Sequence, residues 1–292
     1  KIHSEKQMNL AALYNDGNEA ETPLTTRADN LSISGGTFQV ECFADEFTKE
    51  SSVYGVYNYH ANSISIHNVN FYIVNRGNGA LQKAVGCYTN GRFGRFIGNN
   101  IKANCMHSAG KEKEQAHAVG VINEGLHTIF AANNIVGEWA GKSIAMHNCG
   151  KYAELYGNKI LATHVIHGIG VLNTANECIV ENNVIVSTSR NARLIVQQAS
   201  NCIIGRNILE VFQDKNECCS GCGIYAVEQG ISGNIVTENI IKNVSDVGIF
   251  SASEAGAFER NRIIDCGIPT AGLENRCIAD RLNEKRICSL IE

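Results

Sequence analysis

The residues best suited to chemistry are a carboxylate and an imidazole, Glu124 and His147, at one position of two successive copies of a repeated pattern. If those copies are neighbouring strands of a sheet, the two side chains lie about 4.8 Å apart. A Glu beside a His is an acid/base pair in which each group shifts the pKa of the other. A solvated cross-strand ion pair is the second interpretation of the same two residues.

A repeated six-residue motif indicates the scaffold that must position this pair. The motif has an apolar residue, two variable residues, usually Asn, one variable residue and then Ile or Val. Its copies begin at Leu31, Ile64, Phe96, Phe130, Leu155, Ile179, Ile203, Ile235 and Phe258. The steps between them run from 23 to 34 residues. A step near 24 fits one coil of a β-solenoid with three short strands, and the longer steps add a loop of roughly eight to ten residues.

A second motif, about ten residues before each Asn motif, alternates apolar and other residues and therefore predicts a strand. Its copies are Tyr54–Asn58, Val85–Thr89, Val119–Asn123, Ile169–Asn173, Cys222–Ala226 and Val247–Ser251, with Lys142–Met146 and Arg193–Gln197 at the same place without Gly. In this alignment Glu124 and His147 share a column with Tyr59, Asn90, Thr174 and Gln198.

Stacked coils place like residues over like residues and so build a continuous core. We predict one inward column of Ile64, Phe96, Phe130, Leu155, Ile179, Ile203, Ile235 and Phe258. We predict a second of Val69, Ile101, Ile135, Ile160, Val184, Ile208, Ile240 and Ile263. At the bend between them, Asn134, Asn183 and Asn207 should line up, with each amide bonded to the coils on either side.

These coil repeats resemble those of the right-handed parallel β-helix (pectate-lyase-like) superfamily over residues 28–266. The resemblance implies an all-β, single-stranded right-handed parallel β-helix of about nine coils. Members are mostly polysaccharide lyases, glycoside hydrolases, epimerases and phage tailspikes, which implies a polysaccharide or oligosaccharide ligand and no cofactor. The catalytic motifs of those families do not transfer: only His167-Gly168-Ile169-Gly170 echoes part of one. The resemblance therefore implies architecture more specifically than chemistry.

Several residues near the pair suit an acidic glycan. Lys142 and Arg193 fall in the same predicted sheet, and their cations would bind a uronate carboxylate or a sulfate. Asn90 shares the column of Glu124. Trp139, the only tryptophan, falls at a bend, where it contacts sugar or has a packing role.

The neighbouring outward column is unusually apolar for an exposed sheet. It contains Tyr57, Tyr88, Ile122, Ala145, Leu172, Val196, Tyr225 and Phe250. Three interpretations stay open: burial by a loop or in an interface between subunits such as a homotrimer, membership of the core, and an aromatic platform on which Tyr57 and Tyr88 stack against sugar rings.

Composition narrows the class of protein. Lys plus Arg number 25 and Asp plus Glu 29, a net charge of −4, which argues against nucleic acid as a partner. No apolar run reaches the roughly 18 residues of a spanning helix, so we predict no membrane insertion. The 12 cysteines lack paired CxxC spacings, so we predict no metal site. Cys178 and Cys202, one coil apart, are predicted to be free thiols.

The sequence divides into an N-terminal partial coil or cap (1–27), the β-helix (28–266) and a C-terminal cap (267–292). The leading hypothesis is a polysaccharide-active enzyme, a lyase or glycoside hydrolase, with Glu124 and His147 as its acid and base. The alternative is a non-catalytic β-helix module, either a glycan-binding shaft of the tailspike or adhesin kind, trimeric, or a purely structural one. An extracellular or surface location follows from the resemblance alone, and the many cysteines leave an intracellular one open.

Overall fold

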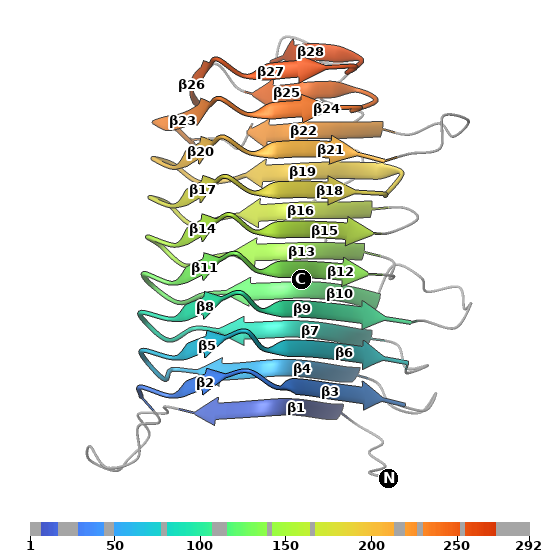
Figure 1. Ribbon diagram of the computed structural model, residues 1–292. Coiled ribbons are helices and arrows are strands. Elements are labelled where there is room, and N and C mark those ends of the chain that lie inside the picture. The colour runs from blue at the N-terminus through green and yellow to red at the C-terminus, as the bar shows by residue number, and fades with distance from the viewer. Residues whose placement is uncertain are drawn as a thin grey trace.

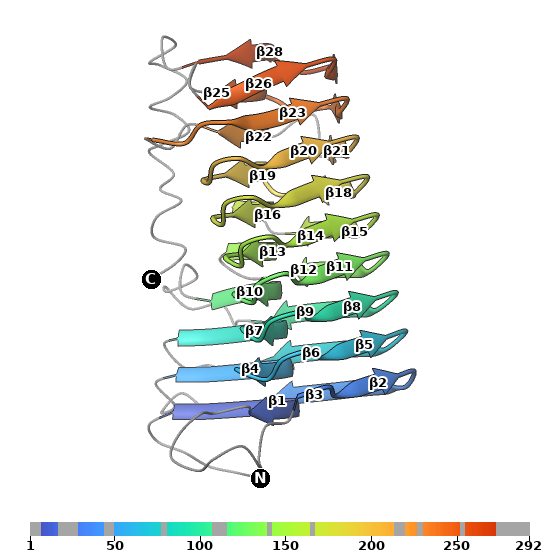
Figure 2. The same ribbon diagram turned by 90° about the vertical axis from the view of Figure 1, so that its left-hand side faces the viewer.

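The chain winds into a right-handed parallel β-helix, which confirms the predicted fold class (Figure 1, Figure 2). The computed structural model describes residues 7–16, 29–43, 50–76, 81–106, 116–138, 142–163, 167–212, 220–226, 230–251 and 255–272. These residues form 28 strands in three parallel sheets, with one strand of each sheet in nearly every coil. No candidate for a membrane-spanning helix occurs in this described part of the chain.

The ten-stranded sheet contains the longest strands, and its two edge strands are the first and the last strand of the β-helix. Its members, in spatial order, are β1 (Gln7–Asp16), β4 (Glu50–Tyr59), β7 (Leu81–Thr89), β10 (Ala116–Asn123), β13 (Lys142–Asn148), β16 (His167–Asn173), β19 (Asn191–Gln197), β22 (Ser220–Ala226), β25 (Val247–Ser251) and β28 (Ile268–Ala271). The edge strand β1 falls within residues 1–27 and pairs with β4, and the opposite edge strand β28 pairs with β25.

The other two sheets have nine strands each. The first contains β2 (Ser32–Ser34), β5 (Ser65–His67), β8 (Arg95–Ile97), β11 (Ile129–Ala131), β14 (Glu154–Tyr156), β17 (Ile179–Glu181), β20 (Ile203–Gly205), β23 (Asn234–Thr237) and β26 (Gly256–Glu259). The second contains β3 (Thr37–Cys42), β6 (Asn70–Asn75), β9 (Asn100–Cys105), β12 (Asn134–Glu138), β15 (Lys159–Thr163), β18 (Val184–Ser187), β21 (Ile208–Val211), β24 (Ile240–Lys242) and β27 (Arg262–Ile264).

The main core lies inside the coil, and its columns follow the strand register. Phe96 and Phe130 stack with ring centroids 4.8 Å apart. The first nine-stranded sheet contributes the column Ile66, Phe96, Phe130, Leu155, Val180, Ile204, Val236 and Phe258. The second contributes Phe71, Ile101, Ile135, Ile160, Ile185, Leu209, Ile241 and Ile263.

Three members of each predicted inward column are therefore wrong by one residue. They are Ile179, Ile203 and Ile235 in the first column and Val184, Ile208 and Ile240 in the second. Ile64 and Val69 are buried in the core as predicted, but Ile66 and Phe71, two residues further on, are the residues in register with the columns. A shift of one residue moves a side chain to the opposite face of a strand. Accordingly Val184 is 39% exposed whereas its neighbour Ile185 is fully buried.

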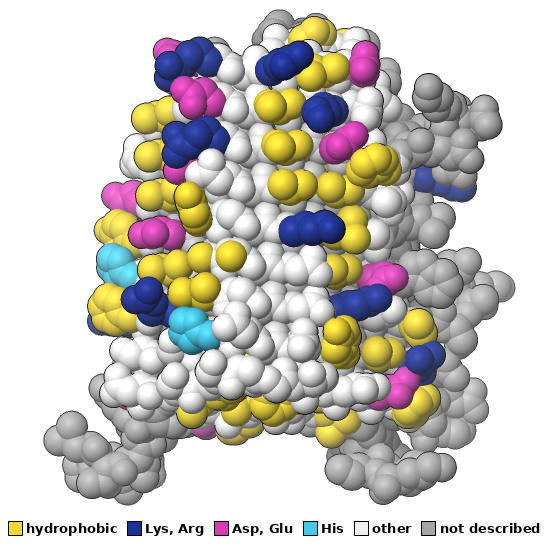
Figure 3. Space-filling view, in the orientation of Figure 1, with side chains coloured by type: hydrophobic (Ala, Val, Ile, Leu, Met, Phe, Trp, Pro, Cys, Tyr) yellow, Lys and Arg dark blue, Asp and Glu magenta, His cyan; other side chains and the backbone are white. Residues whose placement is uncertain are grey.

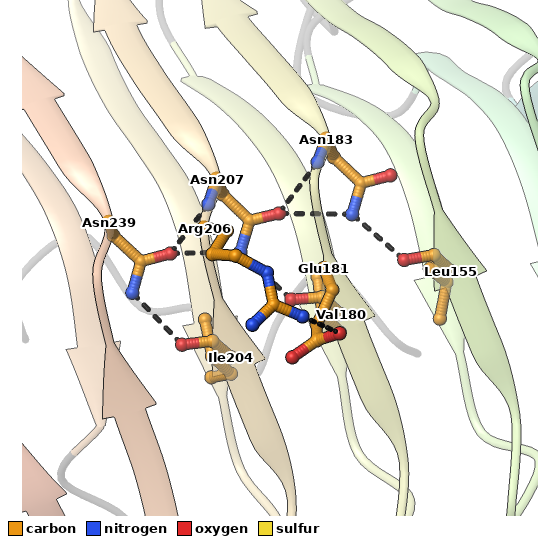
Figure 4. Close-up of polar contacts among 8 residues, drawn as sticks. All are labelled: Leu155, Val180, Glu181, Asn183, Ile204, Arg206, Asn207 and Asn239. Carbon is orange, nitrogen blue, oxygen red and sulfur yellow. Dashed lines mark hydrogen bonds and ion pairs between the residues drawn. The ribbon is translucent and has the colours of Figure 1, made fainter.

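A ladder of buried asparagines runs along the bend between the two nine-stranded sheets (Figure 4). Its members are Asn99, Asn133, Asn158, Asn183, Asn207, Asn239 and Asn261. From Asn133 onward, each amide oxygen accepts from the backbone N–H and the side-chain amide of the Asn one coil earlier, as Asn183 does from Asn158 at 2.9 and 3.0 Å. The Asn99 amide oxygen accepts the backbone N–H of Val69. The alignment of Asn183 with Asn207 is confirmed, but the ladder residue in the coil of Asn134 is Asn133, which donates to Asn158. Asn134 bonds instead to Asn100 on the outer face.

The two nine-stranded sheets also have an outer face on which several charged side chains form ion pairs. Figure 3 shows this face with rows of apolar side chains and with acidic and basic side chains among them. The ion pairs join neighbouring coils: Glu41–Arg76, Lys102–Glu138, Glu181–Arg206 and Glu238–Arg260. Such exposed pairs contribute little to stability, roughly 0–1 kcal/mol each.

Candidate functional site

The strands of the ten-stranded sheet do not alternate strictly, because each bends at the position of Gly120. Ala118 and Val121 belong to the main core, whereas Val119 and Ile122 belong to a separate cluster on the outer face. A Cβ at Gly120 would lie 2.4 Å from the carbonyl oxygen of Ala145 in the next coil, so this position favours glycine. The alternation predicted for this motif therefore breaks at the position of Gly120.

The outer face of this sheet carries a second buried apolar cluster. It consists of Val85, Val119, Ile122, Ile144, Ile169, Leu172, Val196, Cys222, Tyr225, Val247, Phe250 and Ala271, with Tyr54 and Tyr88 packed against it. Most of the predicted apolar column belongs here, but Ala145 is in the main core. The cluster residues are at most 8% exposed within a single chain, so their burial does not require a second subunit.

The register separates Glu124 from His147, which we had predicted to be direct neighbours. His147 pairs with Ile122, and Asn148 pairs with Asn123. Glu124 follows Asn123 directly, so its lateral neighbour in the next coil is Cys149, and His147 lies on the diagonal. Diagonal neighbours across two strands are about 7–8 Å apart.

Glu124 is held by a tyrosine of the preceding coil. The Tyr88 hydroxyl donates to Glu124 Oε2 at 2.7 Å. Burial and this carboxylate both raise the pKa of Tyr88 above its usual value, so the phenol stays protonated at neutral pH. Glu124 is exposed, which leaves it open to solvent and to a ligand.

His147 is a neutral imidazole at physiological pH. Burial, together with the nearby Lys83 ammonium, lowers the pKa of His147 to about 4. Its Nε2 lies 3.1 Å from the Cys149 thiol. Burial raises the pKa of that thiol, so both partners of this hydrogen bond are uncharged. A neutral imidazole in a half-buried position can accept a proton.

Lys83 was not among the predicted site residues, yet its ammonium acts electrostatically on both Glu124 and His147. Burial lowers its pKa, and the Glu124 carboxylate opposes that shift, so the ammonium lies within electrostatic reach of Glu124 as well as His147. Lys83 makes no ion pair with any residue that the structure describes. We call Lys83, Tyr88, Glu124 and His147 the outer-face site; its Tyr88 packs against the buried apolar cluster.

The other predicted binding residues have other neighbours or partners. Lys142 is in register with His117 and His167, near the start of its strand. Arg193 is only 7% exposed and covers the Tyr225 ring, with its guanidinium carbon 5.0 Å from the ring centroid. The Asn90 amide oxygen accepts the backbone N–H of His60 at 2.5 Å. Trp139 lies outside the described residues.

Tyr57 does not have an open ring face for stacking on a sugar. It is stacked between Tyr14 and Tyr88, with centroid separations of 5.5 and 4.9 Å. One face of Tyr88 is covered in the same way. These tyrosines can therefore offer ring edges and hydroxyl groups to a ligand, but Tyr57 cannot act as the predicted platform.

The described residues hold no group of three or more His, Cys, Asp and Glu side chains placed to bind a metal ion. All eight described cysteines, Cys178 and Cys202 among them, are free thiols, as predicted. No family model, curated protein or solved structure matches this chain.

Proposed function

We propose that the protein is a polysaccharide lyase that cleaves an acidic glycan at the outer-face site. The observation that supports this most is the neutral imidazole of His147, whose pKa is lowered by burial and by the half-buried ammonium of Lys83. Lyase chemistry on a uronate needs a base for the proton beside the carboxylate, a cation for the carboxylate, and an acid for the leaving oxygen.

Each need has a candidate among these residues. Lys83 binds the uronate carboxylate and stabilises the charge that builds up on it. His147 takes the proton from the carbon beside the carboxylate, and the electron pair of that C–H bond becomes a carbon–carbon double bond. The glycosidic C–O bond breaks as the leaving oxygen takes the proton of Tyr88. Glu124 holds the Tyr88 hydroxyl in place and later returns it to the protonated state by way of solvent.

A lyase fits these residues better than a glycosidase. A glycosidase needs two carboxyl groups about 5–9.5 Å apart. In the described residues, the other carboxylate along the Glu124 column is that of Asp16, which pairs with Tyr59 on β4. Asp16 therefore lies three strand spacings from Glu124, roughly 14 Å away.

The second candidate is a non-catalytic glycan-binding shaft. This candidate is supported by exposed apolar side chains on the two nine-stranded sheets. Examples are Val184, Ile208 and Ile235, which are 39, 36 and 48% exposed. Such side chains are available for contact with other chains, as the predicted trimer would need. Membership of the pectate-lyase-like superfamily and an extracellular location are part of both proposals.

An assay on a panel of polyuronates and neutral polysaccharides tests the proposal. We expect products that absorb as unsaturated uronates, and a fall in kcat of about 10²–10⁴ in His147→Gln. His67→Gln, on the outer face of the first nine-stranded sheet, is the matched control and should keep full activity. New reducing ends without the absorbance would favour a hydrolase. Binding without any product would favour the shaft and refute the lyase.

A further inference from the structure

Three aromatic side chains are stacked on the outside of the bend that joins the ten-stranded sheet to the first nine-stranded sheet. Phe93, His127 and Tyr152 come from successive coils, with ring centroids 5.4 and 4.6 Å apart and ring planes 10 and 8° from parallel. Phe93 and Tyr152 are 55 and 44% exposed, and His127 is exposed as well. Along the left-hand edge of Figure 3, a histidine lies between hydrophobic side chains, with basic side chains next to them. We call these three residues the aromatic stack.

The backbone of this bend does not favour bulky side chains. Phe93 and Tyr152 have φ angles of 60 and 59°, in the left-handed region that glycine and asparagine adopt most readily. The bend between the two nine-stranded sheets also has a left-handed residue in successive coils, and there the chain uses Gly98, Ala132, Gly157, Asn182, Arg206 and Glu238. A bend of this kind therefore does not require aromatic rings. Backbone strain that is retained in exposed residues is typical of a binding site.

The stack ends in an open ring face at Phe93. One face of this ring is covered by His127. The equivalent residue of the preceding coil is Ser63, which also has a positive φ angle and whose backbone N–H donates to the carbonyl of Arg92. Its short side chain cannot cover a phenyl ring, and no second aromatic partner of Phe93 occurs among the described residues. A ring-shaped ligand can therefore extend the stack at this end.

Two arginines flank the open face. Arg92 directly precedes Phe93, and Arg95 follows it by two residues on β8. Both arginines are exposed, and neither forms an ion pair within the described part of the chain. The carboxylate of Asp29, further towards the N-terminal end of the same bend, accepts the backbone N–H of Asn62 at 2.6 Å. Two guanidinium groups are therefore available to a ligand on the ring, and guanidinium groups bind carboxylates and sulfates through paired hydrogen bonds.

We infer that the open face of Phe93, together with Arg92 and Arg95, binds an acidic sugar unit of a polysaccharide. The C–H groups of a sugar ring carry partial positive charge and pack against the negative face of an aromatic ring. The two guanidinium groups pair with the carboxylate or sulfate of the same unit. Stacking on His127 holds the Phe93 ring in place before the ligand arrives, so little entropy is lost on binding. The net charge of −4 favours a glycan over a nucleic acid as the polyanion.

The aromatic stack follows the outer-face site closely along the chain. Phe93 comes five residues after Tyr88, and His127 comes three residues after Glu124. Five residues span at most roughly 18 Å, so a glycan of several units can contact both places. The inference rests on the proposed function for the class of ligand, but it requires no cleavage. A subsite of this kind lowers KM without acting on the chemical step.

Affinity electrophoresis of the full chain in native gels tests the inference. The gels contain polygalacturonate, dextran sulfate or neutral dextran, and the chain carries His147→Gln so that cleavage does not remove the ligand. We expect an acidic polymer, and not neutral dextran, to retard the chain. Phe93→Ala should weaken this binding about tenfold, and Phe93→Tyr should restore it. Phe212→Ala, which removes a ring that is 56% exposed, is the matched control and should bind as its parent does.

The double variant Arg92→Gln, Arg95→Gln should also bind about tenfold more weakly and with less dependence on salt, because its charge-assisted bonds are gone. The acidic polymer that binds more tightly identifies the anionic group as a carboxylate or a sulfate. Equal affinities of Phe93→Ala and Phe212→Ala, with both variants folded by circular dichroism, would overturn the inference. Tighter binding of a single-stranded oligonucleotide than of either acidic polymer would overturn it as well.

Kinetics with His147 intact separate this site from the proposed function. In an active lyase, Phe93→Ala should raise KM about tenfold. A chain that cleaves nothing, but whose binding of the acidic polymer is weakened by Phe93→Ala, refutes the lyase and supports this site. Cleavage with a KM and an affinity that Phe93→Ala leaves unchanged supports the lyase and refutes this site.

Discussion

Removal of one ladder amide should destabilise the β-helix far more than removal of an asparagine on its outer face. The Asn183 side chain makes four hydrogen bonds: it accepts from the Asn158 backbone N–H and side-chain amide, and it donates to the Leu155 carbonyl and to Asn207 Oδ1. In Asn183→Ala the Asn158 N–H and the Leu155 carbonyl lose these partners inside the protein. Each buried unsatisfied group costs about 1–3 kcal/mol, so we expect a loss of about 2–6 kcal/mol.

Equilibrium unfolding in urea, followed by circular dichroism, measures this loss. The matched control is Asn134→Ala, which removes the same chemical group from a partly buried position with one bond to Asn100 at 2.8 Å. That bond contributes about 1 kcal/mol. If the two variants differed by less than about 0.5 kcal/mol, the ladder would not stabilise the stacked coils as we argue. Similar slopes of the two unfolding curves are required for the comparison.

Further predictions concern pH and register. His117 and His147 bind protons near pH 4 when folded and near 6.5 when unfolded, so the unfolded state binds more protons between these values. The free energy of unfolding should therefore fall as pH drops from 6.5 to 4, by up to about 3 kcal/mol per histidine. A melting temperature that falls equally in the natural chain and in the double variant His117→Gln, His147→Gln would contradict this. Ile185→Ala should cost about 2–4 kcal/mol because it empties a fully buried position, whereas Val184→Ala, at a 39% exposed position, should cost less than about 1. Equal losses in urea unfolding would show that the register is wrong.

The fold could be predicted from the sequence because its period is strong and its bends carry asparagines. The columns are correct at Phe96 and Leu155, where a charged residue directly precedes the apolar one. They slip where two apolar residues are adjacent, as in Ile179-Val180 and Ile203-Ile204, since either can be the inward residue by hydrophobicity alone. The pair Asn133-Asn134 poses the same ambiguity for the ladder.

The candidate site was predicted only in part, for a related reason. The segment at residues 142–146 lacks the glycine that marks the bend in other coils, so our alignment placed His147 two positions away from its true place. The buried asparagines Asn123, Asn148 and Asn173 are in register and give the correct alignment. Each outward residue precedes one of these asparagines, which puts His147 beside Ile122. Lys83 gave no such signal, because its importance comes from burial that only the folded coils create.

The outer-face site differs physically from the rest of the scaffold. The asparagine ladder pairs its amides from coil to coil, and the two cores bury their apolar residues, which favours stability. At the outer-face site, burial instead lowers the pKa of Lys83 and of His147. Groups with shifted pKa values of this kind are typical of a site that is retained for binding or catalysis.

The most direct test of the functional account is a crystal structure of the protein soaked with an acidic oligosaccharide. We predict sugar density over the outer face of the ten-stranded sheet, with the carboxylate of one residue at Lys83 and the adjacent C–H within reach of His147. Density that lies only on the nine-stranded sheets, or an outer-face site that stays empty at saturating oligosaccharide, would contradict the account.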